Sequence, residues 1–237
     1  MLFLIPYAVI FWIFAFVSIL IKAAREDEIT FQKERLSQLP KPLFIVIKFI
    51  PALTAVIIFL LFRPTVSLFY ILLAVAFVFC LLGEIGMETK FLVGVGLFLI
   101  AQIVFIANFI WQSLLSGISF LPVVAFVTAF LVWILVIIFL TNYIESAETG
   151  LGQMKVPLII YALTVSLTFC SALMLWLTSG VLLGVIPVIG AFFFVISDFT
   201  IGIKEFHHHF NKAEIFIFTT YYLAIFLLSL SVAIFIF

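Results

Sequence analysis

Eight long apolar stretches run along this chain, and they constrain its fold more than any other feature. They cover residues 2–22, 43–62, 66–83, 91–112, 121–140, 156–177, 180–200 and 213–236. Crossing a hydrocarbon layer about 30 Å thick takes roughly 20 apolar residues in a helix. Backbone polar groups inside lipid must be hydrogen-bonded within the segment itself, which favours helices over open strands. The sequence therefore predicts an all-α integral membrane protein with eight transmembrane helices.

The composition leaves little material for a separate soluble domain. Hydrophobic residues make up 67% of the 237 residues and charged residues only 9%, whereas a globular domain has about 25% charged residues. The formal net charge is zero, so there is no electrostatic case for nucleic-acid binding. Cys80 and Cys170 lie inside apolar stretches, and we interpret them as small core residues. We expect one membrane domain over residues 1–237, in contact with the lipid bilayer and without a cofactor; its oligomeric state stays open.

Basic residues collect at alternate connections between the apolar stretches. Arg63, beside Pro64 at the end of the second stretch, is the one basic residue on the opposite side. Cytoplasmic loops of membrane proteins carry an excess of Lys and Arg. We therefore predict that connections 1–2, 3–4, 5–6 and 7–8 are cytoplasmic and that both termini face outward. The ten residues in or beside these connections are Lys22, Arg25, Lys33, Arg35, Lys41, Lys48, Lys90, Lys155, Lys204 and Lys212.

Two further features of the sequence concern the arrangement of the chain: its longest polar segment and a similarity between its two halves. Residues 22–41 predict a short amphipathic or helical loop at the headgroup level. Landmarks of the first half return in the second, with Pro42 and Pro157 115 positions apart and Glu84 and Asp198 114 apart. Each half, about 1–115 and 116–237, holds four stretches, so the halves would share one orientation. This arrangement predicts a parallel repeat about an axis along the membrane normal.

Two carboxyl side chains inside apolar stretches are the first functional candidates. Glu84 and Asp198 each lie about 18 residues into their stretches, at the predicted cytoplasmic end. An ionisable residue within a membrane span is costly and marks a functional site by default. Other polar residues gather in the same half of the bundle, which predicts a pocket open to the cytoplasmic leaflet and not a pore. They are Lys48, Gln102, Asn108, Tyr161, Tyr221 and Tyr222.

A pair of carboxyl groups in an apolar site can supply a general acid and a general base. Acid-initiated hydrolysis would use such a pair, and so would a proton-coupled transporter of small molecules or lipids. The residues alone leave both alternatives open. The run His207-His208-His209 lies between the seventh and eighth stretches, and adjacent histidines on a helix point in different directions. We interpret it as a headgroup-facing loop and expect no metal site.

Short motifs follow one another in a fixed order between residues 41 and 225. They are Lys41-Pro42-Leu43; Gly83-Glu84 with Phe91, Gly94, Phe98 and Ala101-Gln102; Val156-Pro157 with Tyr161-Ala162; Gly190-Ala191 with Phe194, Ser197-Asp198 and Phe206; and Thr220-Tyr221-Tyr222 with Ala224. This ordered set resembles the motifs of the YhhN family of membrane lysoplasmalogenases, in which KPL is the first motif.

The resemblance implies an eight-helix enzyme that hydrolyses the vinyl ether bond of a lysophospholipid substrate. The products are a fatty aldehyde and glycerophospho-ethanolamine or glycerophospho-choline. By position, Glu84 and Asp198 take the places of the family's two acidic residues, the same pair that the polar pattern singles out. Glu84 replaces an Asp, Gln102 a His and Ile225 a Gln. Because an amide cannot carry a proton at neutral pH, a non-catalytic membrane homologue is another alternative.

The remaining candidate residues are assigned to the substrate. Lys41 or Lys48 would hold the phosphate group at the cytoplasmic surface. Gln102, Tyr161 and Tyr221, with the neighbouring Tyr222, would orient water or the glycerol hydroxyl.

Overall fold

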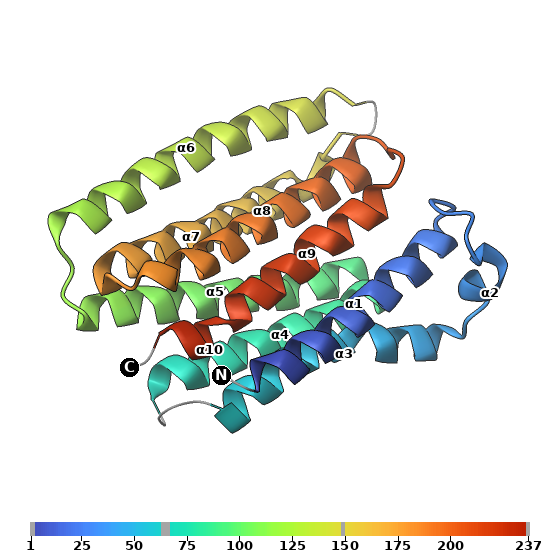
Figure 1. Cartoon of the computed structure of the whole chain (residues 1–237). Helices are drawn as coiled ribbons and strands as arrows, with labels where there is room; N and C mark the ends of the chain where they lie inside the picture. The colour runs from blue at the N-terminus through green and yellow to red at the C-terminus, as the bar shows by residue number, and fades with distance from the viewer. Residues whose placement is uncertain (1–2, 63–66, 148–149, 236–237) are drawn as a thin grey trace.

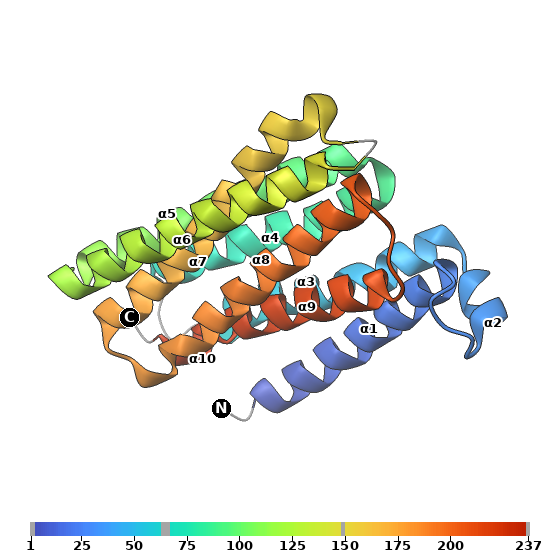
Figure 2. The same ribbon diagram turned by 90° about the horizontal axis from the view of Figure 1, so that it is seen from above.

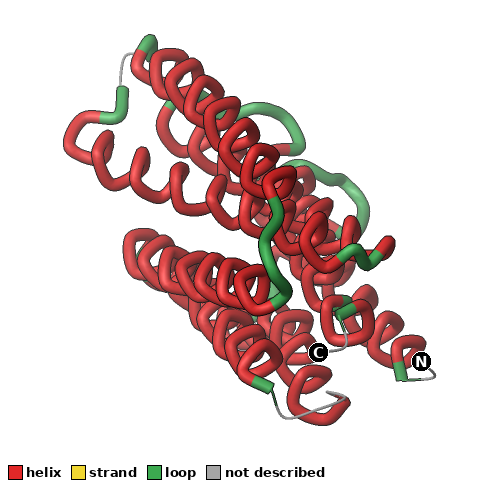
Figure 3. Tube along the Cα trace, turned by 90° about the vertical axis from the view of Figure 1, so that its left-hand side faces the viewer, coloured by secondary structure: helices red, strands yellow, loops and turns green. Residues whose placement is uncertain are grey.

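A computed structural model of the chain describes residues 3–62, 67–147 and 150–235. It is 86% helical, and the described residues contain no strand (Figure 3). Eight of its helices are long and apolar enough to cross a membrane. The predicted fold class, an all-α protein with eight potential transmembrane helices, is therefore confirmed. The predicted break at Arg63-Pro64 lies outside the described residues.

The eight long helices correspond one to one with the eight apolar stretches. A short helix, α2 (Lys33–Ser37), occupies the polar segment that was predicted to be helical or amphipathic, and another, α10 (Ser231–Ile234), follows the last long helix. The long helices are α1 (Leu4–Arg25), α3 (Lys41–Phe62), α4 (Leu68–Thr89), α5 (Phe91–Leu115), α6 (Phe120–Glu145), α7 (Lys155–Ser179), α8 (Val185–Phe206) and α9 (Ala213–Ser229).

The helices run roughly alongside one another in a bundle, with both chain ends at the end of the bundle opposite α2 (Figures 1 and 2). Neighbours in sequence pack against each other in both halves: α1 on α3, α3 on α4 and α4 on α5, then α6 on α7, α7 on α8 and α8 on α9. The internal repeat and the sidedness of the loops stay predictions.

Two helices extend beyond the apolar stretches that predicted them. The third stretch was expected to close at Gly83-Glu84, but α4 continues to Thr89. The seventh was expected to end at residue 200, just after Ser197-Asp198, but α8 continues to Phe206. Polar residues continue both helices once the apolar run has stopped. As a result Glu84 and Asp198 lie within their helices, at least one turn from the end.

Glycines bring the two acid-bearing helices close to their neighbours. A Cβ atom added at Gly86 would lie 2.8 Å from the backbone of Gly94, so α4 and α5 are in near-backbone contact. A Cβ atom at Gly190 would lie 2.9 Å from the backbone nitrogen of Leu228, so α8 and α9 are equally close. Small residues permit this close approach in membrane bundles, where van der Waals packing replaces the hydrophobic effect.

The helix α6 lies at the edge of the bundle (Figure 1). Its buried residues are Pro122, Ile137 and Ile144, and it packs mainly on α7. Trp133 anchors it, with its ring against those of Phe169 on α7 and Phe199 on α8. The outward face of α6 is apolar, as expected for a surface that meets lipid.

Candidate active site

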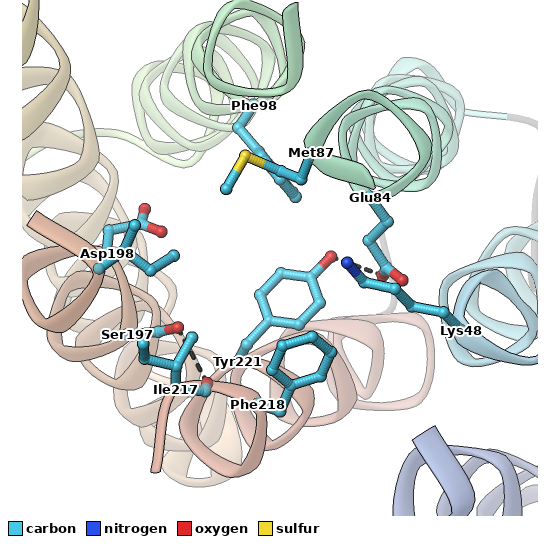
Figure 4. Close-up of a pocket in the computed structure, with 10 residues that line it drawn as sticks. Lys48, Glu84, Met87, Phe98, Ser197, Asp198, Ile217, Phe218 and Tyr221 are labelled. Atoms are coloured by element: carbon cyan, nitrogen blue, oxygen red, sulfur yellow. Dashed lines mark hydrogen bonds between the residues drawn. The ribbon is translucent and has the colours of Figure 1, made fainter. Parts of the chain in front are cut away.

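A cavity of about 390 Å³ brings the two predicted carboxyl groups together at one end of the bundle. We call it the carboxyl cavity. Figure 4 shows Glu84 and Asp198 on opposite sides of it, with the ring of Tyr221 between them. Its lining residues are Lys48, Glu84, Met87, Phe98, Ser197, Asp198, Ile201, Ile217, Phe218 and Tyr221.

Glu84 is the more deeply placed of the two carboxyl groups, with 2% of the residue exposed. The Tyr221 hydroxyl donates a hydrogen bond to Glu84 Oε1 at 2.7 Å. The ring of Tyr221 is fixed edge-on between Phe98 and Phe194. Glu84 Oε2 is buried and has no hydrogen-bond partner among the described residues. This oxygen is therefore free to bond to water or to a ligand in the cavity.

Asp198 is partly exposed and is held by a second tyrosine. The Tyr161 hydroxyl, from α7, donates to Asp198 Oδ2 at 2.8 Å. The preceding residue, Ser197, donates to the Ile217 carbonyl at 3.0 Å and so ties this part of α8 to α9. Each carboxyl group is thus oriented by one phenolic hydroxyl from a different helix. The two differ in exposure, which is suited to different roles for chemically similar groups.

Lys48 lines the same cavity, but its ammonium group already has a carboxylate partner. Its Nζ donates to Glu88 Oε1 at 2.6 Å and lies 4.9 Å from the centre of the Phe218 ring. Glu88 was not singled out from the sequence. It lies four residues after Glu84, on the same face of α4, a relation that appears only once the helix is known to continue past the apolar stretch.

Four predicted substrate residues lie outside the lining of the carboxyl cavity, and one of them, Tyr161, is linked to it by its hydrogen bond to Asp198. Lys41 is exposed at the first position of α3. Tyr222 is fully buried, and its hydroxyl donates to the Lys48 carbonyl at 3.2 Å, so it supports the helix that carries Lys48. Gln102 is fully buried one helical turn beyond Phe98. Neither the nitrogen nor the oxygen of its side-chain amide has a partner among the described residues.

A second space, the charged vestibule, adjoins the carboxyl cavity toward the end of the bundle where α2 lies. It has a volume of about 650 Å³ and shares Lys48, Met87, Ile201, Ile217 and Phe218 with the carboxyl cavity. Equal numbers of positive and negative side chains line it, namely Lys22, Lys48, Lys204, Glu88, Glu205 and Glu214.

Ion pairs and a helix cap hold the vestibule walls. Lys204 pairs with Glu214 and, at 3.4 Å, with Glu205. Glu28, in the segment after α1, accepts hydrogen bonds from the backbone N–H groups of Glu214 at 2.8 Å and Ile215 at 3.0 Å. A carboxylate at a helix N-terminus satisfies N–H groups that lack a partner within the helix. The first loop is thereby fixed to the start of α9.

The histidine run lies between α8 and α9, in the loop where it was predicted. The ring of His207 stacks on that of Tyr143, with centroids 4.2 Å apart. Within the described residues, no group of three or more His, Cys, Asp or Glu side chains could hold a metal ion. Cys80 and Cys170 are both buried and free.

The fold and site define a class: a multi-pass helical membrane protein with two tyrosine-bound carboxyl groups facing one cavity beneath a charged vestibule. Residues 43–232, most of the chain, match the YhhN family. The chain therefore belongs to the YhhN family. The match covers both carboxyl groups and both tyrosines, and it begins after α1 and α2. No curated protein and no solved structure matches the chain.

Proposed function

We propose that this protein is a lysoplasmalogenase-like hydrolase, which cleaves the vinyl ether bond of a lysoplasmenyl-glycerophospholipid. The observation that carries the proposal is the pair of carboxyl groups, Glu84 and Asp198, across one cavity, each bound by a tyrosine. Membership of the YhhN family is consistent with this activity. The cavity also adjoins a charged vestibule, which suits a lipid with a polar headgroup.

The chemistry requires one proton donor and one carboxylate. The donor protonates the β-carbon of the vinyl ether, which leaves an oxocarbenium ion on the α-carbon and ether oxygen. The carboxylate stabilises this cation and accepts a proton from the water that adds to the α-carbon. The resulting hemiacetal collapses by breaking the bond between this carbon and the glycerol oxygen. One water is consumed, and a fatty aldehyde and a glycerophospho-alcohol are released.

Glu84 and Asp198 take these two roles, one as the proton donor and the other as the carboxylate. Tyr221 and Tyr161 hold the two carboxyl groups in place. Lys48, at the boundary between cavity and vestibule, would bind the substrate phosphate.

Gln102 cannot replace a histidine as a proton carrier, but its unpartnered amide can hold a water molecule. An unpaired polar group in an apolar interior is costly, so a bound water is the arrangement we expect there.

The direct test is release of aldehyde from lysoplasmenyl-phosphoethanolamine by the protein purified in detergent. We expect release by the wild type and a loss of at least 100-fold in Asp198→Asn and in Glu84→Gln, since the loss of one acid–base group typically costs 10²–10⁴-fold. Matched controls are Asp27→Asn and Glu145→Gln, which change exposed carboxyl groups away from the carboxyl cavity. Absence of release by the wild type, or full activity in Asp198→Asn, would contradict the proposal.

The transporter alternative predicts a different result in a different assay. Labelled lysophospholipid would move between the leaflets of liposomes that contain the protein, without release of aldehyde. A protein with neither activity would be the non-catalytic homologue.

A further inference from the structure

Four cavities lie in a series in which each shares lining residues with the next, and Asp198 lines three of them. The charged vestibule leads into the carboxyl cavity, as described above. The carboxyl cavity in turn shares Met87, Phe98, Asp198 and Ile201 with a space between α5, α7 and α8, which we call the α5 chamber. The α5 chamber also shares lining residues with a space beneath α6, which we call the α6 chamber. The shared residues are Leu158, Tyr161, Asp198 and Gly202.

The polarity of the lining falls along this series. Six charged side chains line the vestibule, and three, Lys48, Glu84 and Asp198, line the carboxyl cavity. In the α5 chamber, of about 360 Å³, the only polar side chains are those of Tyr161 and Asp198. In the α6 chamber, of about 470 Å³, Thr141 joins these two. A ligand that fills the series has a charged or zwitterionic end and a long apolar end, with Asp198 beside the junction.

Gly202 lies in the wall that the two apolar chambers share. A Cβ atom added there would meet only Ile144 Cδ1, at 3.9 Å. Close packing therefore does not require glycine at this position, unlike Gly94 and Gly190, where an added Cβ would approach neighbouring backbone within 3 Å. Glycine weakens a helix relative to alanine, yet α8 carries it here. The absence of a side chain at Gly202 leaves space between Asp198 and α6.

We propose that the α6 chamber binds the hydrocarbon chain of a single-chain amphiphile, and that the missing side chain of Gly202 keeps the passage to it open. The polar end of the same molecule lies in the charged vestibule. This inference rests on the proposed function in one respect, which is that the polar end is a glycerophospholipid headgroup. Occupation of the chamber by a chain does not depend on hydrolysis.

The position of the chain can be mapped without catalysis. The probe is an ester-linked lysophosphatidylethanolamine with a photoreactive diazirine at the chain terminus, which contains no vinyl ether. After illumination and digestion, we expect labels on the inward residues of α6, Ile137 and Ile144, each 5% exposed. A probe that merely dissolves in the detergent or lipid around the protein would instead label outward residues such as Leu135 and Phe139, which are 68% and 72% exposed.

Substitution of Gly202 tests the passage. Gly202→Phe should reduce labelling of Ile137 and Ile144 at least tenfold, and Gly202→Val should reduce it less. The matched control is Gly96→Phe on α5, another mid-helix glycine; its added Cβ has no neighbour within 4 Å, and it does not line any of the four cavities. Thermal unfolding of each variant checks that the fold is kept.

The outcomes separate this inference from the proposed function. Labels confined to Leu135 and Phe139, or labelling of Ile137 that is unchanged in both Gly202 variants, would overturn the chain site. Inward labels that Gly202→Phe removes and Gly96→Phe retains would support it, even if the wild type releases no aldehyde and the proposed reaction fails. If aldehyde is released, Gly202→Phe should lower the ratio of rates for long-chain over short-chain substrates at least tenfold.

Discussion

Lys48 and Glu88 form an ion pair in which the two side chains are only 8% and 12% exposed. Removing one member of a buried pair leaves an uncompensated charge, which costs about 3–5 kcal/mol. For Lys48→Met we expect about 3 kcal/mol, because the charged vestibule lets water reach the remaining Glu88 carboxylate. For Glu88→Met we expect about 2 kcal/mol, because the Lys48 ammonium keeps its contact with the Phe218 ring, which contributes about 1 kcal/mol.

The double variant Lys48→Met/Glu88→Met removes both charges and replaces them with apolar side chains of similar length. Exchanging a buried pair for hydrophobic residues is often neutral, so we expect a stability within about 1 kcal/mol of the wild type. The measurement is reversible unfolding in mixed micelles with increasing dodecyl sulfate, followed by tryptophan fluorescence. A double variant that loses the sum of the two single costs would refute the reasoning, because it would show that the two side chains do not interact.

The same double variant separates the structural role of Lys48 from its proposed role in binding. It should be folded and yet have a kcat/KM at least tenfold below the wild type, since a charge-assisted hydrogen bond to phosphate contributes about 1.5–3 kcal/mol. Wild-type kcat/KM in a stable double variant would exclude Lys48 from substrate binding.

Three further predictions follow from contacts elsewhere in the bundle. Tyr161→Phe removes the hydrogen bond that orients Asp198 and should lower kcat about tenfold with little change in KM, because a side-chain hydrogen bond contributes about 1 kcal/mol or more; an equal rise in KM would point to substrate binding instead. Gly94→Leu should lower the free energy of unfolding in dodecyl sulfate by about 3 kcal/mol or more, because the added Cβ would lie 2.5 Å from the backbone of α4. The control Gly96→Leu should change this free energy little, because its added Cβ has no neighbour within 4 Å. Glu28→Ala should cost about 1 kcal/mol and speed amide hydrogen exchange in the first turn of α9; unchanged exchange would show that the cap is not formed.

The fold could be predicted because the thickness of a hydrocarbon layer sets the length of each apolar stretch. The ends of the helices could not be predicted in the same way. Once the apolar run stops, hydrophobicity no longer distinguishes a helix that continues from a loop that begins. Glu88 was missed for this reason, since it follows the apolar stretch of α4 and resembles a loop residue until the helix is seen to include it.

The candidate site was partly visible in the sequence because Glu84 and Asp198 are ionisable residues among apolar ones. The sequence does not reveal which tyrosine faces which carboxyl group. Tyr221 and Tyr222 are adjacent and differ by about 100° around α9, so only one of them can reach Glu84. The choice depends on how α9 is rotated against α4 and α3, which is a property of packing and not of composition.

The position of α6 at the edge of the bundle has a kinetic consequence. This helix forms one wall of the α6 chamber, and it packs mainly on α7, so a small displacement of α6 would join the chamber to the surrounding lipid. A substrate that enters there never leaves the bilayer, and its encounters with the protein take place in two dimensions. The rate of the proposed hydrolysis should then follow the mole fraction of substrate in the membrane. Adding inert lipid at constant bulk substrate concentration should slow the reaction, as surface dilution does for enzymes that take their substrates from an interface.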